Sequence, residues 1–241
     1  ATSTDYGETW HTDPSTVRIN RDGLEFPIPI VDDIPAASPA NKDWQMSAFL
    51  PGRDGDDYVY EFGTPSGRSG QARLARVPKA QIADRLAYQY WDGSAWSSSI
   101  TDAATVIDGK VSELSVQWND YLGKYIAMYT DLSGLVMRVA DSPEGPWVGK
   151  RTIISGTLLP SLYGGFMHPW ATGSDLYFVL TTWDRYNVIY MKTDLGAMNL
   201  RTAVPMDSPD PAITGEQRLE GFETPEGFVT PEEFAETVDG E

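Results

Sequence analysis

The sequence predicts an all-β fold built from repeated four-stranded units, and two observations carry this prediction. Short runs of β-branched and aromatic residues alternate with turns rich in Gly, Asp, Asn and Pro along most of the 241 residues. Three segments of the chain can also be laid over one another, with their second strands starting about 50–65 residues apart, which is the size of one four-stranded antiparallel unit with modest loops.

The three repeats divide into runs that each have the length of a strand. Helix signals are weak, and only residues 79–86 suggest one or two helical turns. The strands are expected at residues 45–50, 57–62, 72–77, 88–97, 113–118, 124–129, 135–140, 165–170, 176–181 and 188–192.

A turn motif close to the first residue indicates which architecture these units form. The residues Ser3, Asp5, Gly7 and Trp10 have the spacing S-x-D-x-G-x-T-W, which resembles the Asp-box of sialidase-type β-propellers. Gly7 supplies a backbone conformation that other residues adopt at a cost. The oxygens of Ser3 and Asp5 can accept hydrogen bonds from turn amides, and Trp10 is expected to pack back onto the blade.

The position of the motif predicts a partial propeller. Residues 139–147 overlay residues 1–10, so the first residue is expected in the third strand of a blade whose first two strands are absent. We therefore expect about three and a half C-terminal blades of a longer propeller. An N-terminal fragment or a partner chain would complete the ring, since an open ring exposes edge strands. The first residues carry no initiator Met, so either a leader was removed or the chain was cut.

Composition excludes several classes of function. The net charge is −17, which makes a nucleic-acid partner or an anionic lipid surface unfavourable. The chain has no cysteine, so it has neither disulfides nor thiolate metal ligands, and no apolar run approaches the ~20 residues of a membrane span. The acidic charge suits an exported protein, which we expect to be extracellular or associated with a cell wall.

The last part of the chain differs in texture from the repeats. Pro, Asp, Glu and Gly dominate after about residue 205, and strand alternation stops. We expect two regions, a propeller part over residues 1–204 and an acidic tail over residues 205–241. The tail is either a solvated linker or a docking segment that uses Phe222, Phe228 and Phe234.

Four strings of residues together resemble one known family. They are YEFGTPSGR at residues 60–68, ELSVQWN at 113–119, YGGFMHPW at 163–170, and the stretch from Leu176 to Asn187. The chain is similar here to the actinobacterial propellers first catalogued as DUF4185, whose members are endo-D-arabinofuranosidases. The resemblance covers about residues 1–195. It implies a five-bladed β-propeller, hydrolysis of cell-wall D-arabinan with inversion, and export. In such propellers the first blades commonly carry an essential Asp.

Propeller geometry sorts the candidate residues by face. In each blade the first, innermost strand runs along the central axis of the propeller. The start of this inner strand and the loop between the second and third strands of the blade lie on the face that usually holds ligand. Asn119, Asp120 and Asp175 belong to the opposite face. Glu113 stands at the start of an inner strand, where we expect a partly desolvated carboxyl suited to a general acid. A structural carboxylate that ties blade loops together is the alternative.

Glycoside hydrolysis normally requires two carboxyl groups. We expect Asp184 to be the catalytic partner of Glu113 in this chain, with Asp131 or an Asp of absent blades as the alternatives. The expected substrate-binding residues share the ligand face and the capacity to stack on sugar or bond its hydroxyls. These residues are Gln45, Arg68, Tyr163, His168, Trp183, Tyr186 and Asn187.

The sequence leaves two classes of function open. The first is an endo-acting glycoside hydrolase of D-arabinan, and the second is a non-catalytic propeller that binds wall glycan or a protein in an envelope assembly. No metal-ligand spacing, phosphate-binding loop or nucleophile elbow occurs, so no metal or cofactor is expected.

Overall fold

The structure is a computed structural model, and it describes residues 2–11 and 39–198. These residues contain strands, turns and short 3-10 helices, and none of them lies in an α-helix, which confirms the all-β prediction. No described helical segment has the length and hydropathy needed to span a bilayer. The chain divides into two compact units, residues 1–110 and residues 111–241, and each unit has its own sheets.

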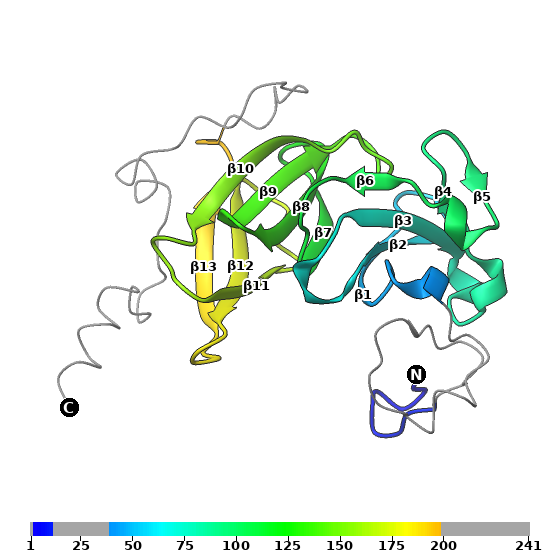
Figure 1. Ribbon diagram of the computed structural model, residues 1–241. Coiled ribbons are helices and arrows are strands. Elements are labelled where there is room, and N and C mark those ends of the chain that lie inside the picture. The colour runs from blue at the N-terminus through cyan, green and yellow to red at the C-terminus, as the bar shows by residue number, and fades with distance from the viewer. Residues whose placement is uncertain (1, 12–38, 199–241) are drawn as a thin grey trace. The chain divides into compact units, whose positions relative to one another are not determined.

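The first unit is built around one six-stranded antiparallel sheet. Its strands follow the order β1-β2-β3-β4-β5, and β6 also pairs with β3 (Figure 1). The central strands are the most deeply buried, with Phe62, Leu74 and Val77 fully shielded from water. The strands are β1 (Met46–Pro51), β2 (Tyr58–Thr64), β3 (Ala72–Pro78), β4 (Gln89–Trp91), β5 (Trp96–Ser97) and β6 (Thr105–Ile107).

Short 3-10 helices connect the strands of the first unit. The helical turns expected over residues 79–86 occur as two of these, η4 and η5, and Asp84 caps η5 by accepting a hydrogen bond from the Leu86 amide at 2.9 Å. The segments are η2 (Pro39–Asn41), η3 (Ser66–Arg68), η4 (Lys79–Gln81), η5 (Arg85–Ala87) and η6 (Ile100–Asp102).

The second unit consists of two antiparallel sheets. The first has the order β10-β9-β8-β7 and the second has the order β11-β12-β13, as Figure 1 shows. A meander of four consecutive antiparallel strands, such as β7 to β10, is the unit from which propeller blades are made. The strands are β7 (Leu114–Asn119), β8 (Lys124–Asp131), β9 (Gly134–Ala140), β10 (Val148–Ser155), β11 (Leu162–Met167), β12 (Asp175–Thr182) and β13 (Ile189–Asp194).

One hydrophobic core joins the two sheets of the second unit. Ile126, Met128 and Met137 from the first sheet cluster with Leu176 and Phe178 from the second, and all five are fully buried. Alternate residues of β12 enter this core while their neighbours are partly exposed, as the period of two requires. The sequence pattern therefore sets which face of β12 is covered.

The turn at residues 2–11 has the geometry expected of an Asp-box. The amide of Gly7 donates to Ser3 Oγ at 2.8 Å, and the amide of Thr9 donates to Asp5 Oδ1 at 2.9 Å. Gly7 has φ +94°, a conformation that favours glycine. Trp10 donates its indole N–H to the Gly7 carbonyl at 3.0 Å but is 63% exposed, so the packing expected for it is not seen.

The structure differs from the predicted strands in four places. The single run expected over residues 88–97 forms two paired strands, β4 and β5. Strands β6 and β10 had not been expected, because their runs are short or interrupted by charged residues. The third inner strand is β11, which begins at Leu162 rather than residue 165, and residues 168–170 follow it as a turn. The ring of five blades stays a prediction, and the acidic tail of residues 205–241 lies outside the described residues.

Replacement of Gly134 by Ala is expected to destabilise the second unit. A Cβ at this position would lie 2.0 Å from the backbone oxygen of Ile154, and the φ of +128° is itself strained for any side chain. A backbone atom cannot move aside as the end of a flexible side chain can. The free energy of unfolding should therefore fall by about 1–3 kcal/mol, measured by denaturant titration. Gly173→Ala is the matched control, since a Cβ there would meet no other atom within 4 Å. An equal loss in the two variants would contradict the close strand approach.

The Asp5 carboxyl should stay ionised in acid. The hydroxyl and amide of Thr9, followed by the Ser3 hydroxyl, lower the pKa of Asp5 from 3.8 to about 2. Because this pKa is depressed in the folded turn, the carboxylate stabilises the turn above about pH 4, and this contribution is lost as the pH falls toward 2. Carboxyl ¹³C NMR titration should show the low value, and Thr9→Val should raise it. An unchanged titration in that variant would show that the Thr9 hydroxyl has no such role.

Candidate functional site

The inner strands of the second unit, β7 and β11, are tied directly to each other. The amide of Met167 donates to Ser115 Oγ at 3.1 Å, and Gln117 Nε2 donates to the Ala171 carbonyl at 3.1 Å. Gly165 of β11 lies so close to the first sheet that a Cβ there would come within 2.4 Å of Leu135 Cδ1. These contacts set the two strand starts near one another.

The residue before Glu113 fixes the start of β7. Ser112 is fully buried, its amide donates to the Thr130 carbonyl at 3.2 Å, and its hydroxyl accepts from the Thr130 amide at 3.1 Å. The two hydroxyls are also hydrogen-bonded to each other. Because Thr130 belongs to the buried strand β8, Glu113 projects from a backbone that is locked in place.

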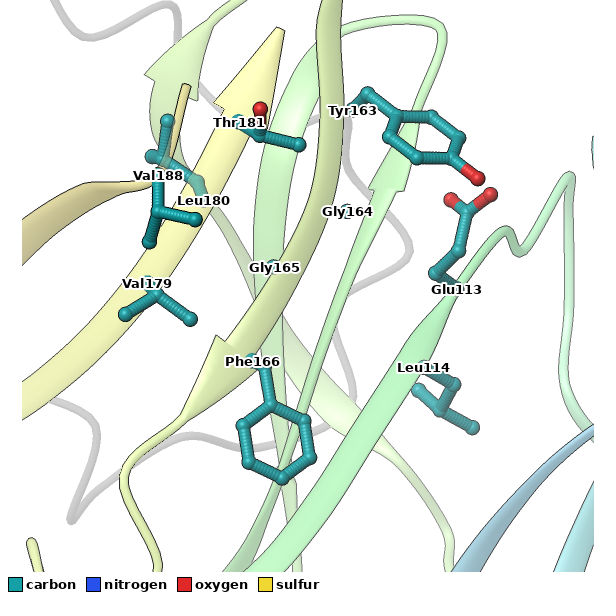
Figure 2. Close-up of a pocket in the computed structure, with 10 residues that line it drawn as sticks. All are labelled: Glu113, Leu114, Tyr163, Gly164, Gly165, Phe166, Val179, Leu180, Thr181 and Val188. Carbon is teal, nitrogen blue, oxygen red and sulfur yellow. The ribbon is translucent and has the colours of Figure 1, made fainter. Parts of the chain in front are cut away.

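Glu113 lines a pocket of about 240 Å³ at this end of the second unit. Its Oε2 atom is buried, and Figure 2 shows its carboxyl facing the hydroxyl end of Tyr163. The rest of the lining is mostly apolar, with Thr181 as its further polar side chain. The lining residues are Glu113, Leu114, Tyr163, Gly164, Gly165, Phe166, Val179, Leu180, Thr181 and Val188.

The loop between β12 and β13 adjoins the pocket. The rings of Tyr163 and Tyr186 meet edge to face, with centroids 6.1 Å apart and an interplanar angle of 74°. Trp183 is 58% exposed and Tyr186 is 68% exposed, so neither belongs to the core. The structure thus brings together Glu113, Tyr163 and the loop that carries Trp183, as expected from the sequence. The binding roles of these aromatic residues stay predictions.

Asp184 occupies this loop as an exposed carboxyl. A hydrogen bond from the Thr182 side chain, which outweighs slight desolvation, lowers the pKa of Asp184 below its usual value. Asp184 is therefore ionised near neutral pH, and it could accept a proton but not donate one. It does not line the pocket. Asn187 lies on the same loop and is likewise exposed.

Asp131, the alternative partner, is committed to other groups. Lys150 Nζ lies 2.5 Å from its Oδ2, while its Oδ1 accepts hydrogen bonds from the amide and hydroxyl of Ser133. Burial raises the pKa of Asp131, but the bonds from Lys150 and Ser133 outweigh it and hold the pKa below its usual range. Asp131 does not line the pocket, so it is better described as a turn carboxylate.

His168 lies at the opposite end of β11 from Tyr163, contrary to the expectation that the two share a face. Its amide donates to the Tyr177 carbonyl at 2.8 Å, and its Nδ1 accepts from the Trp170 amide at 3.3 Å. This turn lies at the end of the unit where Asn119 donates to the Gly173 carbonyl at 3.0 Å. Tyr163 and His168 lie apart because residues 163–168 run along nearly the full length of β11 instead of forming one loop.

Gln45 and Arg68 belong to the first unit. The amide of Gln45 donates to the Thr64 carbonyl at 3.0 Å, which places Gln45 beside the loop that leads to Arg68. Arg68 ends η3 with φ +58°, and Gln45 Nε2 donates to the Asn41 carbonyl at 2.8 Å. That these two residues share a site with Glu113 stays a prediction.

Comparison with known proteins assigns the chain to a family. Residues 1–192 match the family described as "Domain of unknown function (DUF4185)". The chain belongs to this family. The DUF4185 match spans the Asp-box, the whole pocket lining and the aromatic loop.

Two curated relatives of this DUF4185 chain come from fungi. Notoamide biosynthesis cluster protein J' of Aspergillus versicolor is 34% identical over 140 residues, which cover 54% of this chain and 38% of the relative. Notoamide biosynthesis cluster protein J of an Aspergillus species is 33% identical over 143 residues, covering 54% and 37%. The chain therefore spans less than two fifths of the length of these relatives.

Among solved structures, the chain is similar to several enzymes at low identity. An exo-beta-1,3-galactanase from Phanerochaete chrysosporium aligns with a TM-score of 0.44 and 12% identity over 68% of this chain and 35% of the enzyme. An alpha-L-arabinofuranosidase from Clostridium thermocellum aligns with a TM-score of 0.30 and 11% identity over 80% and 76%. At these scores no activity is carried over to the DUF4185 chain.

Sequence reasoning missed the apolar part of the pocket. Phe166, Val179 and Val188 line it, yet only their neighbours had been singled out. The signal lies in the Gly164–Gly165 pair, because adjacent glycines inside a strand indicate a bulge. The register of β11 against β12 does shift between Tyr163 and Gly165. Among the described residues no three His, Asp or Glu side chains gather as a metal ion would require.

Removal of the Thr182 hydroxyl should raise the pKa of Asp184. The Thr182 side chain is the largest cause of the lowered value, so Thr182→Val should move the carboxyl titration toward the ordinary range of Asp, as followed by ¹³C NMR. Thr181→Val is the matched control, because Thr181 is adjacent in sequence and its hydroxyl faces the Thr182 carbonyl. If the two variants shift Asp184 equally, the Thr182 bond is not the cause.

Proposed function

We propose that this DUF4185 chain is part of a glycoside hydrolase in which Glu113 is the general acid. One observation carries the proposal, namely a carboxyl at the start of a locked inner strand that lines an open pocket beside a tyrosine. A general acid must reach the leaving-group oxygen in a site where water is restricted. The partly buried carboxyl of Glu113 meets this requirement, whereas the exposed Asp184 and the ion-paired Asp131 do not.

The proposed reaction inverts the configuration at the anomeric carbon. Glu113 donates its proton to the glycosidic oxygen as the C–O bond breaks, and water attacks the opposite face of the sugar while a carboxylate takes the water's proton. Inverting enzymes keep the two carboxyl groups ~6.5–9.5 Å apart to leave room for this water. Asp184 is the candidate base in this chain, since its lowered pKa leaves it ionised.

The proposed substrate is the D-arabinan of a cell wall, cut within the chain. This choice rests on the family resemblance of the four sequence strings. The pocket supports it through its chemistry, because aromatic and aliphatic side chains accept the C–H faces of sugar rings while Glu113 and Tyr163 bond to hydroxyls. An extracellular or wall-associated location, and an N-terminal part that completes the propeller, belong to the same proposal.

A second function is favoured by one observation. Glu113 contributes the one carboxyl among the described residues that line the pocket. A pocket with one carboxyl binds glycan without hydrolysing it unless a second carboxylate is supplied from elsewhere. A non-catalytic propeller that binds wall glycan or a protein of an envelope assembly is therefore the alternative. Incubation of the full-length protein with arabinogalactan, followed by analysis of released oligosaccharides, separates the two functions.

Replacement of Glu113 by Gln should remove turnover and keep substrate binding. The amide preserves shape but cannot donate the proton that the transition state requires, so kcat should fall by about 10²–10⁴-fold. The melting temperature should change little. Asp175→Asn is the control, since this exposed carboxyl lies at the opposite end of the unit, 3.6 Å from Lys192. Unchanged turnover with a lowered melting temperature would make Glu113 a structural tie and transfer the catalytic role to other residues.

A further inference from the structure

The exposed loop between β12 and β13 carries two aromatic side chains that no core contact explains. We propose that Trp183 and Tyr186, together called the aromatic platform, form a second ring-binding subsite for a neutral oligosaccharide that extends out of the Glu113 pocket. The inference rests on the proposed function in taking a glycan as the ligand. It adds that the protein binds at least two consecutive sugar rings at this end of the second unit.

The size of the pocket limits what it can hold. Its volume of about 240 Å³ lies below the ~300–1,000 Å³ of pockets that enclose drug-sized ligands. A pocket of this size accommodates one sugar ring and not a run of them. A glycan bound at Glu113 must therefore continue along the neighbouring surface.

Tyr186 of the platform lies next to the pocket. Val188 ends the loop and lines the pocket, while Tyr186 contacts Tyr163, whose ring lines the pocket as well. Figure 2 shows Tyr163 and Val188 on different sides of the Gly164–Gly165 pair, so the loop connects to the pocket rim at more than one point. A ring leaving the pocket past Tyr163 would next meet the side chain of Tyr186.

The backbone of the loop is held by hydrogen bonds at both platform residues. The amide of Trp183 donates to the Ser161 carbonyl at 2.8 Å, and the amide of Tyr186 donates to the Thr182 carbonyl at 2.8 Å. The platform is therefore preorganised, and binding need not order the loop. Preorganisation of this kind favours affinity because less conformational entropy is lost on binding.

Tyr186 is kept in a conformation that is unfavourable for folding. Its φ is +55°, in the left-handed region that tyrosine rarely adopts, and its ring is 68% exposed and so gains little from burial. Backbone strain at an exposed aromatic residue indicates a role other than stability. The role consistent with its position is to present a ring face to ligand.

The net charge of the chain favours a neutral occupant. Asp184 and Arg185 lie between the two aromatic residues in the sequence and carry opposite charges, whereas the whole chain carries a net charge of −17. An anionic polymer would be repelled, whereas a neutral sugar can stack its C–H face on an aromatic ring and donate hydroxyl hydrogen bonds to a carboxylate. A neutral glycan thus fits this surface better than an acidic one.

Calorimetric titration of the full chain with arabinan oligosaccharides of increasing length tests the subsite. The Glu113→Gln background prevents hydrolysis, so binding is measured without turnover. Affinity should rise when the ligand grows from one ring to two or three and then level off. Tyr186→Asn should weaken binding of the longer ligands by about 2–10-fold and leave the monosaccharide unaffected. Because Asn tolerates positive φ, this variant should not lower the melting temperature.

Two controls sharpen the result. Tyr186→Phe keeps the ring and should retain affinity, and Leu132→Ala removes another exposed side chain, 87% exposed on the β8–β9 turn, which does not line the pocket. Equal effects of Tyr186→Asn on one ring and on longer ligands, or no binding of any oligosaccharide, would overturn the subsite. Capture of a polypeptide with no affinity for oligosaccharide would also overturn it. Length-dependent binding without turnover by the unsubstituted protein would uphold the subsite and reject the proposed hydrolysis.

Discussion

The hydrogen bond from the Met167 amide to the Ser115 hydroxyl is the contact on which the rest of the second unit depends. It joins the inner strands of two separate sheets, and the bond from Asn119 to the Gly173 carbonyl repeats this tie at the other end. An antiparallel meander alone leaves its inner strand with unpaired backbone groups along one edge. The Ser115 side chain of β7 satisfies one amide of β11, and the two sheets share one core.

The environments of three carboxyl groups show how the same chemical group acquires different capacities. Glu113 projects from a locked strand into a pocket, with one oxygen shielded from water. Asp131 is partly buried as well but is held by Lys150 and by its own turn. Asp184 is exposed, and the hydrogen bond from the Thr182 side chain lowers its pKa. Only the first combines partial shielding with access to a ligand, which is the physical basis for assigning it the acid role.

The apolar lining of the pocket and the aromatic loop are parts of one surface. A sugar ring carries both C–H groups and hydroxyls, so a site for it requires flat apolar contacts with few but well-placed polar groups. The second unit supplies the former through Phe166, Tyr163 and Tyr186 and the latter through Glu113 and Asp184. The chain covers 38% of the length of a curated relative.

The sequence by itself determined most of the strands, the Asp-box turn and the residues at the start of β7. Alternation of apolar residues and short turns are local signals, so β8, β9 and β12 were predicted within about two residues at each end. Tyr163 and the 183–187 loop lie together as expected, because the antiparallel pairing of β11 with β12 places the start of one strand beside the end of the other. Glu113 joins them in the lining of the pocket although β7 belongs to another sheet.

Only the tertiary structure decided the rest. The glycine pair at Gly164–Gly165 indicates the bulge in β11, but no local pattern encodes the close contact of Gly165 with Leu135. The bounds of β11 place His168 just after its last residue, at the far end from Tyr163. The engagement of Asp131 by Lys150 joins residues distant in sequence. The apolar wall of Phe166, Val179 and Val188 likewise arises where three segments meet, because a pocket is a property of packed strands rather than of any one of them.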